Sequence, residues 1–246
     1  MNLEELYYND LLVKGGFFAM LFLAVPLFVA FRKYRYFDKS LRFLVYFLLI
    51  DLLILFLVQL FSWMTLTYES YWSPILQQYG IGSTNIFSIL SYINRFLILR
   101  CYFVYSFKIF TASQILKFIP FVLLSIVFID FFFITGIDNM SAFSQSVQTF
   151  YVIFFVAIQL WYVYKDTSKV MLNRNPYFWI SMGLFFPSLL SVWSSIFANN
   201  LYEQDFVLFC QISLVECIIY CTGLFLISVG FYYGRNVKYL DKNNTF

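Results

Sequence analysis

Histidine is absent from this chain of 246 residues. Its absence excludes His-based acid–base pairs, Ser-His triads and the histidine-containing zinc-protease motif. The chain also has no G-x-S-x-G turn and no phosphate-binding glycine loop, and it has no lysine deep inside an apolar run. We therefore expect no enzymatic function and no catalytic residue.

Charge is scarce as well. Only 12% of the residues are charged while 62% are hydrophobic, and a soluble domain carries roughly twice that charged fraction. Lipid is therefore the expected solvent for most of the surface, because a soluble protein of this composition would expose large apolar patches. The net charge of +3 is scattered over short loops, so we expect no nucleic-acid partner.

Cysteine is limited to four residues, none of them in a C-x-x-C pair. Without histidine they are not expected to bind zinc. The sequence predicts no metal site and no cofactor, and it predicts that the thiols pack between helices: Cys101, Cys210, Cys217 and Cys221.

Long apolar runs dominate the rest of the chain. Windows of about 20 apolar residues occur seven times. The first is no signal peptide, because Glu4, Glu5 and Asp10 precede it where a signal peptide carries positive charge. We predict an all-α, seven-helix transmembrane bundle that forms one domain over residues 1–246, with spans at 11–31, 42–64, 84–107, 117–136, 144–164, 177–198 and 207–232.

Basic loop residues alternate from one side of the predicted bundle to the other. They gather in the first, third and fifth connections and after the last span: Arg32, Lys33, Arg35, Lys39, Arg42, Lys108, Lys117, Lys165, Lys169, Arg174, Arg235, Lys238 and Lys242. The opposite loops carry acidic residues instead: Glu69, Asp138, Glu203 and Asp205. The positive-inside rule then places the N-terminus outside and the C-terminus in the cytoplasm, which requires an odd number of spans.

Five ionisable residues lie well inside the predicted spans: Asp51, Arg95, Arg100, Asp130 and Glu216. At 1.5 Å per residue, Arg95 is roughly 17 Å and Glu216 roughly 14 Å below the outer end of its span. Arg100 and Asp51 both fall in the cytoplasmic half. We therefore expect two ion pairs, Arg95 with Glu216 and Arg100 with Asp51, because an unpaired charge in hydrocarbon is costly.

Two interpretations of these charges stay open. They are structural pins that fix neighbouring helices, or they line a water-filled cavity that binds a polar or charged ligand or relays protons. Arg95 is the residue on which we base the second interpretation, with Tyr92 one turn before it and Asn94 adding hydrogen-bonding capacity. Arg100 fits the first better, because it can extend toward the cytoplasmic surface. Ser188, Ser191 and Ser195 are spaced to form one stripe on a helix.

Three segments resemble a known group of proteins: NPYFWISMGLFF (175–186), NNLYEQDFVLFCQI (199–212) and LRFLVYFLLIDLL (41–53). Together the layout over residues 40–232 resembles small, uncharacterised seven-helix membrane proteins frequent in Bacteroidota genomes. The resemblance implies a bacterial inner (plasma) membrane protein and brings no activity with it. Members of that group tend to carry a glutamate in the third span where this chain has Arg95, so no ligand chemistry carries over.

Retinal proteins share the seven-helix layout, but they need a lysine in the last helix, and the run 206–231 has none. Our leading hypothesis is a non-enzymatic inner-membrane protein with a polar core, receptor-like or an accessory subunit of a signalling or envelope complex. Membrane lipids would surround it, and its basic cytoplasmic loops would dock a membrane or cytoplasmic protein partner or serve only to set the topology. The alternative is a small secondary transporter for a polar or anionic solute.

Overall fold

The computed structural model describes residues 3–68, 70–72, 74, 84–106, 114–136, 141–165 and 171–236. Every regular element within these ranges is helical. The long helices are α1 (Leu3–Phe22), α2 (Ala24–Lys33), α3 (Lys39–Thr67), α7 (Gln114–Ile129), α8 (Ala142–Lys165), α9 (Pro176–Gln204) and α10 (Phe206–Tyr233). Short 3₁₀ turns follow α2 (Tyr34–Tyr36), precede α9 (Leu172–Arg174) and follow α10 (Gly234–Asn236).

The predicted third span is helical but irregular. It consists of a 3₁₀ turn (Thr84–Phe87), α5 (Ser88–Ile93), a π-helical segment (Asn94–Ile98) and α6 (Leu99–Ser106). A second π-helical segment, Asp130–Thr135, continues α7. Single π turns inside α-helices are found frequently at functional sites, and these two contain Arg95 and Asp130.

Six helices of the described part are long and apolar enough to cross a membrane: Asp10–Tyr36, Lys39–Thr65, Lys117–Ile134, Ala142–Lys165, Pro176–Phe197 and Phe206–Tyr233. They confirm six of the seven predicted spans to within a few residues. The span predicted at 84–107 is not among them. Its helix is divided into the four pieces given above, and it carries two arginines, which lower its hydropathy.

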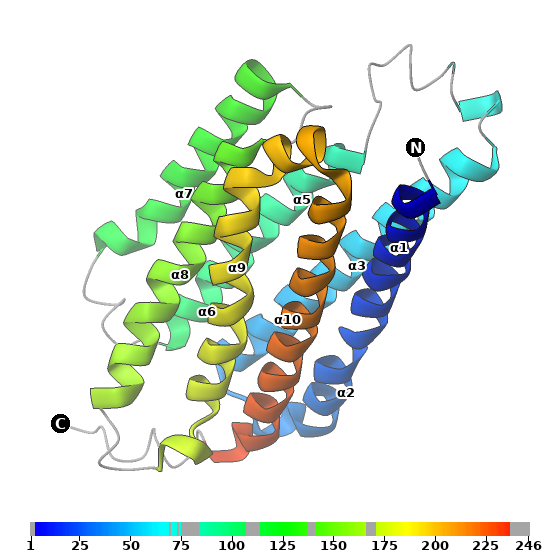
Figure 1. The fold of residues 1–246 in the computed structure, drawn as a ribbon. Helices are drawn as coiled ribbons and strands as arrows, with labels where there is room; N and C mark the ends of the chain where they lie inside the picture. The colour runs from blue at the N-terminus through cyan, green and yellow to red at the C-terminus, as the bar shows by residue number, and fades with distance from the viewer. Residues whose placement is uncertain are drawn as a thin grey trace.

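The helices form one elongated bundle (Figure 1). Helices α8, α9 and α10 lie side by side in chain order, and α1 and α2 pack along α10 on the side away from α8. Helix α3 packs against α6 and against the π-helical segment 94–98, which brings residues 84–106 into the middle of the bundle. Helix α1 begins at the end where α9 passes into α10, and α10 ends at the opposite end.

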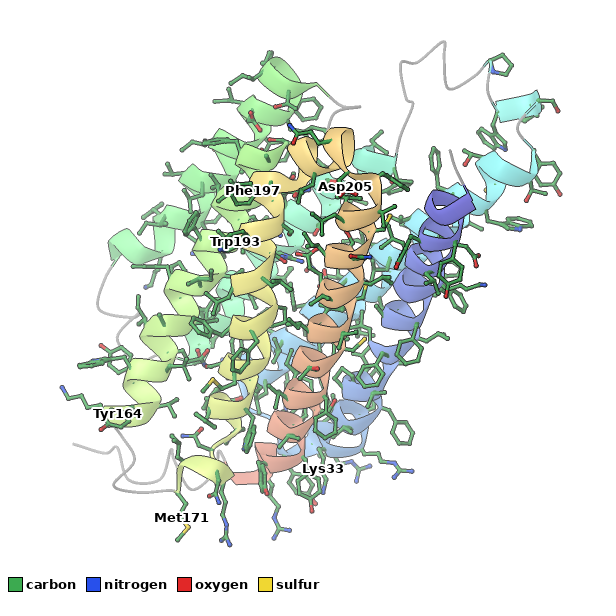
Figure 2. The ribbon with its side chains drawn as sticks, in the orientation of Figure 1. Lys33, Tyr164, Met171, Trp193, Phe197 and Asp205 are labelled. Carbon is green, nitrogen blue, oxygen red and sulfur yellow. The ribbon has the colours of Figure 1, made fainter. Side chains whose placement is uncertain are left out.

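The surface of the bundle is apolar and its interior holds polar groups. Large apolar side chains are exposed along the long helices; Phe133 is 84% and Trp193 is 68% exposed. Buried polar residues include Asn94, Asp130 and Gln159. Figure 2 shows Trp193 and Phe197 on α9, with Asp205 and Lys33 at opposite ends of the bundle. This distribution, together with the six apolar helices, indicates a multi-pass membrane protein.

Polar residues and proline define where several helices begin. Asp38 accepts a hydrogen bond from the backbone N of Leu41 at the start of α3, and Asp205 caps α10 through the backbone N of Leu208. Asn175 caps α9 immediately before Pro176. Each cap satisfies an N–H group that the first helical turn leaves free. The sequence N-P at 175–176 thus acts as a helix start.

Helices α9 and α10 approach each other closely at two glycines. A Cβ atom on Gly183 would lie 2.5 Å from the carbonyl oxygen of Gly223, and one on Gly223 would lie 2.5 Å from Cγ of Pro187. Only glycine fits this contact, and small residues at such crossings are typical of membrane helices. The close contact fixes how α9 and α10 are positioned along each other. The polar residues described below lie on other turns of the same two helices.

A polar cluster ties α3 to α9 at the end of the bundle that contains Lys33. The Tyr177 hydroxyl donates to Oδ2 of Asp38 at 2.6 Å, and the Ser40 hydroxyl lies 2.8 Å from the Tyr177 hydroxyl. Ser40 also donates to Asp38. Nearby in the bundle, the amide of Gln159 is hydrogen-bonded to the Tyr102 hydroxyl.

Candidate ligand-binding cavity

A half-enclosed cavity of about 260 Å³ lies in the half of the bundle nearest the α9–α10 connection. Its walls come from residues 88–95, the first two turns of α8, the last part of α9 and the first part of α10. Most of the residues that line it are polar: Ser88, Ser91, Tyr92, Arg95, Gln145, Gln148, Thr149, Ser191, Ser194, Ser195, Leu201, Phe209, Ile212, Ser213 and Glu216. Four separate segments thus contribute polar side chains to one space.

Arg95 enters this cavity from the π-helical segment Asn94–Ile98. With the amide of Gln148 turned so that its oxygen faces the guanidinium, that oxygen accepts hydrogen bonds from Nε and Nη1 of Arg95, each 2.7 Å long. We assign this orientation because the opposite one points the amide N–H groups at a cation. The Nη2 group has no partner among the described residues.

Glu216 lines the same cavity from α10. Its Oε1 atom accepts a short hydrogen bond from the Ser194 hydroxyl on α9. The predicted ion pair between Arg95 and Glu216 is wrong for this structure: both residues are described, and no ion pair joins them. The two charges face one cavity, and each is hydrogen-bonded to a neutral group, Arg95 to Gln148 and Glu216 to Ser194.

A second, smaller cavity of about 80 Å³ lies beyond Arg95. Arg95 and Ser191 line both cavities, and Asp51 and Tyr220 line the smaller one. Oδ1 of Asp51 accepts a hydrogen bond of 2.7 Å from Nδ2 of Asn94. Arg95 therefore faces both the larger cavity and the smaller one, which the carboxylate of Asp51 also lines.

Asn94 supports this arrangement from the interior of the bundle. Its Nδ2 group also donates to the backbone oxygen of Phe47 at 3.0 Å. Its Oδ1 atom is buried without a hydrogen-bond partner among the described residues. An unsatisfied buried acceptor costs free energy and is a natural place for a water molecule.

Arg100 lies apart from the cavities. The predicted pair with Asp51 is wrong, because Nε of Arg100 donates to the backbone oxygen of Lys117 at 3.0 Å and its guanidinium lies 4.6 Å from the Phe121 ring centre. Both partners are on α7. Arg100 therefore ties α6 to α7, in agreement with the structural interpretation given for it above.

Asp130 is also a structural group. It is buried in the second π-helical segment, where Ser141, Ser144 and Thr135 donate hydrogen bonds to its carboxylate. Ser141 in turn caps the start of α8, since its hydroxyl oxygen accepts from the backbone N of Ser144 at 3.0 Å. The carboxylate thus joins the end of α7 to the start of α8, next to the cavity but outside its lining.

Tyr92 is buried and lines the larger cavity, one turn before Arg95. Its ring meets the ring of Phe131 edge to face, with 6.4 Å between ring centres. The predicted serine stripe also faces the interior: Ser188 and Ser195 are buried, and Ser191 lines both cavities. Of the predicted site residues, Tyr92, Arg95 and Glu216 share the larger cavity, and Asp51 joins Arg95 in the smaller one.

Gln148, the partner of Arg95, was not among the residues that the sequence singled out. A signal for it exists, because Gln145, Gln148 and Thr149 follow the spacing of one helix face at the start of α8. All three line the cavity. In an otherwise apolar helix such a stripe indicates a polar interface.

No protein-family model matches the chain, and no curated protein or solved structure matches it either. The likeness to small seven-helix proteins of Bacteroidota stays a prediction. Any statement about function therefore rests on the geometry and chemistry of the cavity.

Proposed function

We propose that the chain is a non-enzymatic, multi-pass protein of a bacterial inner membrane that crosses the bilayer seven times, with the N-terminus outside. The divided helix over residues 84–106 supplies the seventh crossing. An odd number agrees with α1 beginning and α10 ending at opposite ends of the bundle. Asp205 lies at the end where α1 begins and Lys33 at the other, which is the polarity that the positive-inside rule requires.

We further propose that the larger cavity binds a small polar solute from the outer side. The observation that carries this proposal is that Arg95 and Glu216 line one cavity, each held by a neutral partner and neither by the other. If the two charges only stabilised the helix arrangement, they would be expected to form an ion pair, because a direct contact best offsets the cost of burying two charges. Two charges kept apart in an open space are instead typical of a binding site.

A receptor-like protein or an accessory subunit of a signalling or envelope complex is the form of this function that the cavity supports best. Ligand binding would bring together groups from α8, α9, α10 and the segment 88–95, and such a change can be transmitted to the other end of the bundle through the rigid α9–α10 pair. The basic residues there, Lys33 and Arg35 among them, would face a cytoplasmic or membrane partner.

Cysteine accessibility tests the existence of the cavity. In a chain whose four native cysteines are replaced by alanine, Ser213→Cys would place a thiol in the cavity, whereas Val215→Cys would place one at a neighbouring position that is 49% exposed on the apolar surface. A charged, membrane-impermeant methanethiosulfonate added outside intact cells should modify the first and not the second. Failure to modify Ser213→Cys, or equal modification of both, would contradict a water-filled cavity that is open to the outside.

A secondary transporter is the second candidate. It is favoured by the smaller cavity, which continues past Arg95 to Asp51 and shares Arg95 and Ser191 with the larger one. Two cavities that share a charged side chain resemble a solute path with a gate. Uptake into proteoliposomes separates the candidates, since a receptor binds solute without accumulating it.

A further inference from the structure

We infer that the ligand of the larger cavity is a small zwitterion whose anionic group binds Arg95 and whose cationic group binds Glu216. This inference rests on the proposed ligand-binding function and adds the chemical class of the ligand. It comes from the charges of the lining: among the described residues that form it, one is a cation and one is an anion.

The first step concerns charge balance. Both charges of the larger cavity are partly buried, and each has a neutral hydrogen-bond partner, Gln148 for Arg95 and Ser194 for Glu216. In the larger cavity a simple anion would neutralise Arg95 and leave Glu216 without a counter-charge. A simple cation would neutralise Glu216 and leave Arg95 with only Asp51, which lines the smaller cavity. A ligand with both charges compensates both residues at once, and charged hydrogen bonds are the strong ones.

The second step concerns free hydrogen-bonding groups. Nη2 of Arg95 has no partner among the described residues and can donate to a carboxylate beside the Nη1 group. The Ser194 hydroxyl binds Oε1 of Glu216, and Oε2 has no hydrogen-bond partner among the described residues. The hydroxyl groups between them, such as those of Ser91 and Ser191, both donate and accept, so they suit either end of a zwitterion.

Asp51 does not take the role of the ligand's anionic group. It lines only the smaller cavity, and Nδ2 of Asn94 occupies its Oδ1 atom. A ligand in the larger cavity therefore meets Arg95 in a space that Asp51 does not line. Binding there can proceed without displacing the Asp51–Asn94 contact.

The third step concerns size and shape. The volume of about 260 Å³ is below the roughly 300–1,000 Å³ of pockets for drug-sized ligands. Leu201, Phe209 and Ile212 provide an apolar part of the wall. These features fit an amino acid or a similarly small betaine, with the charged groups between Arg95 and Glu216 and an apolar part against α10.

Calorimetric titration of the purified protein in lipid nanodiscs tests the inference with matched probes. γ-Aminobutyrate is compared with butyrate and butylamine, which each keep one of its two charges, and L-leucine with 4-methylpentanoate and isoamylamine. At least one zwitterion should bind about tenfold or more tightly than both of its single-charge analogues. Arg95→Gln and Glu216→Gln should each weaken that binding by about tenfold or more.

The variants also distinguish the charges. In the Glu216→Gln protein, the preference for the zwitterion over the carboxylate analogue should disappear, whereas Arg100→Gln, which changes a residue outside the cavity, should leave all affinities unchanged. A carboxylate that binds as tightly as its zwitterion and ignores Glu216→Gln would overturn the zwitterion and leave the proposed binding function in place. If none of the six probes binds, the inference that the ligand is a zwitterion is refuted too. The proposed binding function is refuted only if Ser213→Cys is also unreactive.

Discussion

The contact between Arg95 and Gln148 gives the sharpest test of the described geometry. We consider the variants Gln148→Leu and Arg95→Met, alone and combined. Gln148→Leu removes the oxygen that accepts two hydrogen bonds of 2.7 Å from the guanidinium. The guanidinium then keeps its charge in a partly buried position without those bonds.

The size of the effect follows from the number and type of bonds. Hydrogen bonds between membrane helices contribute on average about 0.6 kcal/mol, and bonds to a charged group are roughly twice as strong as neutral ones. Two charged bonds therefore give a coupling of about 2 kcal/mol between positions 95 and 148. Each single variant should lower the free energy of unfolding, and the double variant should cost about 2 kcal/mol less than the sum of the two.

The assay is reversible unfolding in mixed micelles, with a second cycle as control. Gln145→Leu changes another glutamine of the same cavity wall, one turn earlier on α8, which makes no hydrogen bond to Arg95. Its cycle with Arg95→Met should be additive to within about 0.5 kcal/mol. The cycle of Arg95→Met with Glu216→Gln should couple far less than the one with Gln148→Leu. Additivity at positions 95 and 148, or a dominant coupling between 95 and 216, would refute the assigned contact.

Three further predictions follow from the packing and the polar contacts. Gly223→Ala should lower the free energy of unfolding by about 1–3 kcal/mol through overpacking. In the control variant Gly16→Ala, the new Cβ would lie 3.9 Å from its nearest neighbour, so the protein should be unaffected or stabilised by up to about 1 kcal/mol. Equal effects of the two variants would contradict the close α9–α10 contact. Tyr177→Phe should cost about 1–3 kcal/mol because it leaves Asp38 and Ser40 without the hydroxyl, and Tyr105→Phe, at a half-exposed ring, should cost less than about 0.5 kcal/mol. If the protein transports its ligand, Asp51→Asn should abolish gradient-driven uptake into proteoliposomes while equilibrium binding at the larger cavity is kept; loss of binding instead would place Asp51 in the ligand site.

The sequence was sufficient to predict where six of the helices lie, but it was insufficient to predict which side chains meet between them. Apolar runs and loop charges placed six helices to within a few residues, because a span in lipid must satisfy its own backbone and be long enough to cross. The run at 84–107 was harder, since nothing in its composition distinguishes a π-helical segment at 94–98 from a regular turn. Several of the loop charges used for orientation, Glu69, Asp138 and Lys108 among them, lie outside the described residues.

The pairing errors have a physical origin. Equal depth was the only available criterion for matching Arg95 with Glu216 and Arg100 with Asp51, and depth carries no information on which face of each helix a residue occupies. Arg100 is five residues after Arg95, and the two bind different neighbours: Arg100 binds α7, and Arg95 binds α8. A glutamine as the partner of Arg95 was not anticipated, because charge complementarity favours a carboxylate.

We propose that Arg95 and Glu216 face a shared polar space within a lipid-embedded bundle and form no direct ion pair, so that a ligand can bridge them. The most direct measurement is a density map of the protein in lipid nanodiscs, at a resolution that shows ordered water, with and without the best-binding zwitterion. We expect water or ligand density in contact with both side chains, and Gln148 against the guanidinium. Acyl-chain density at Arg95, or a direct ion pair between Arg95 and Glu216 with no space between them, would refute the proposal.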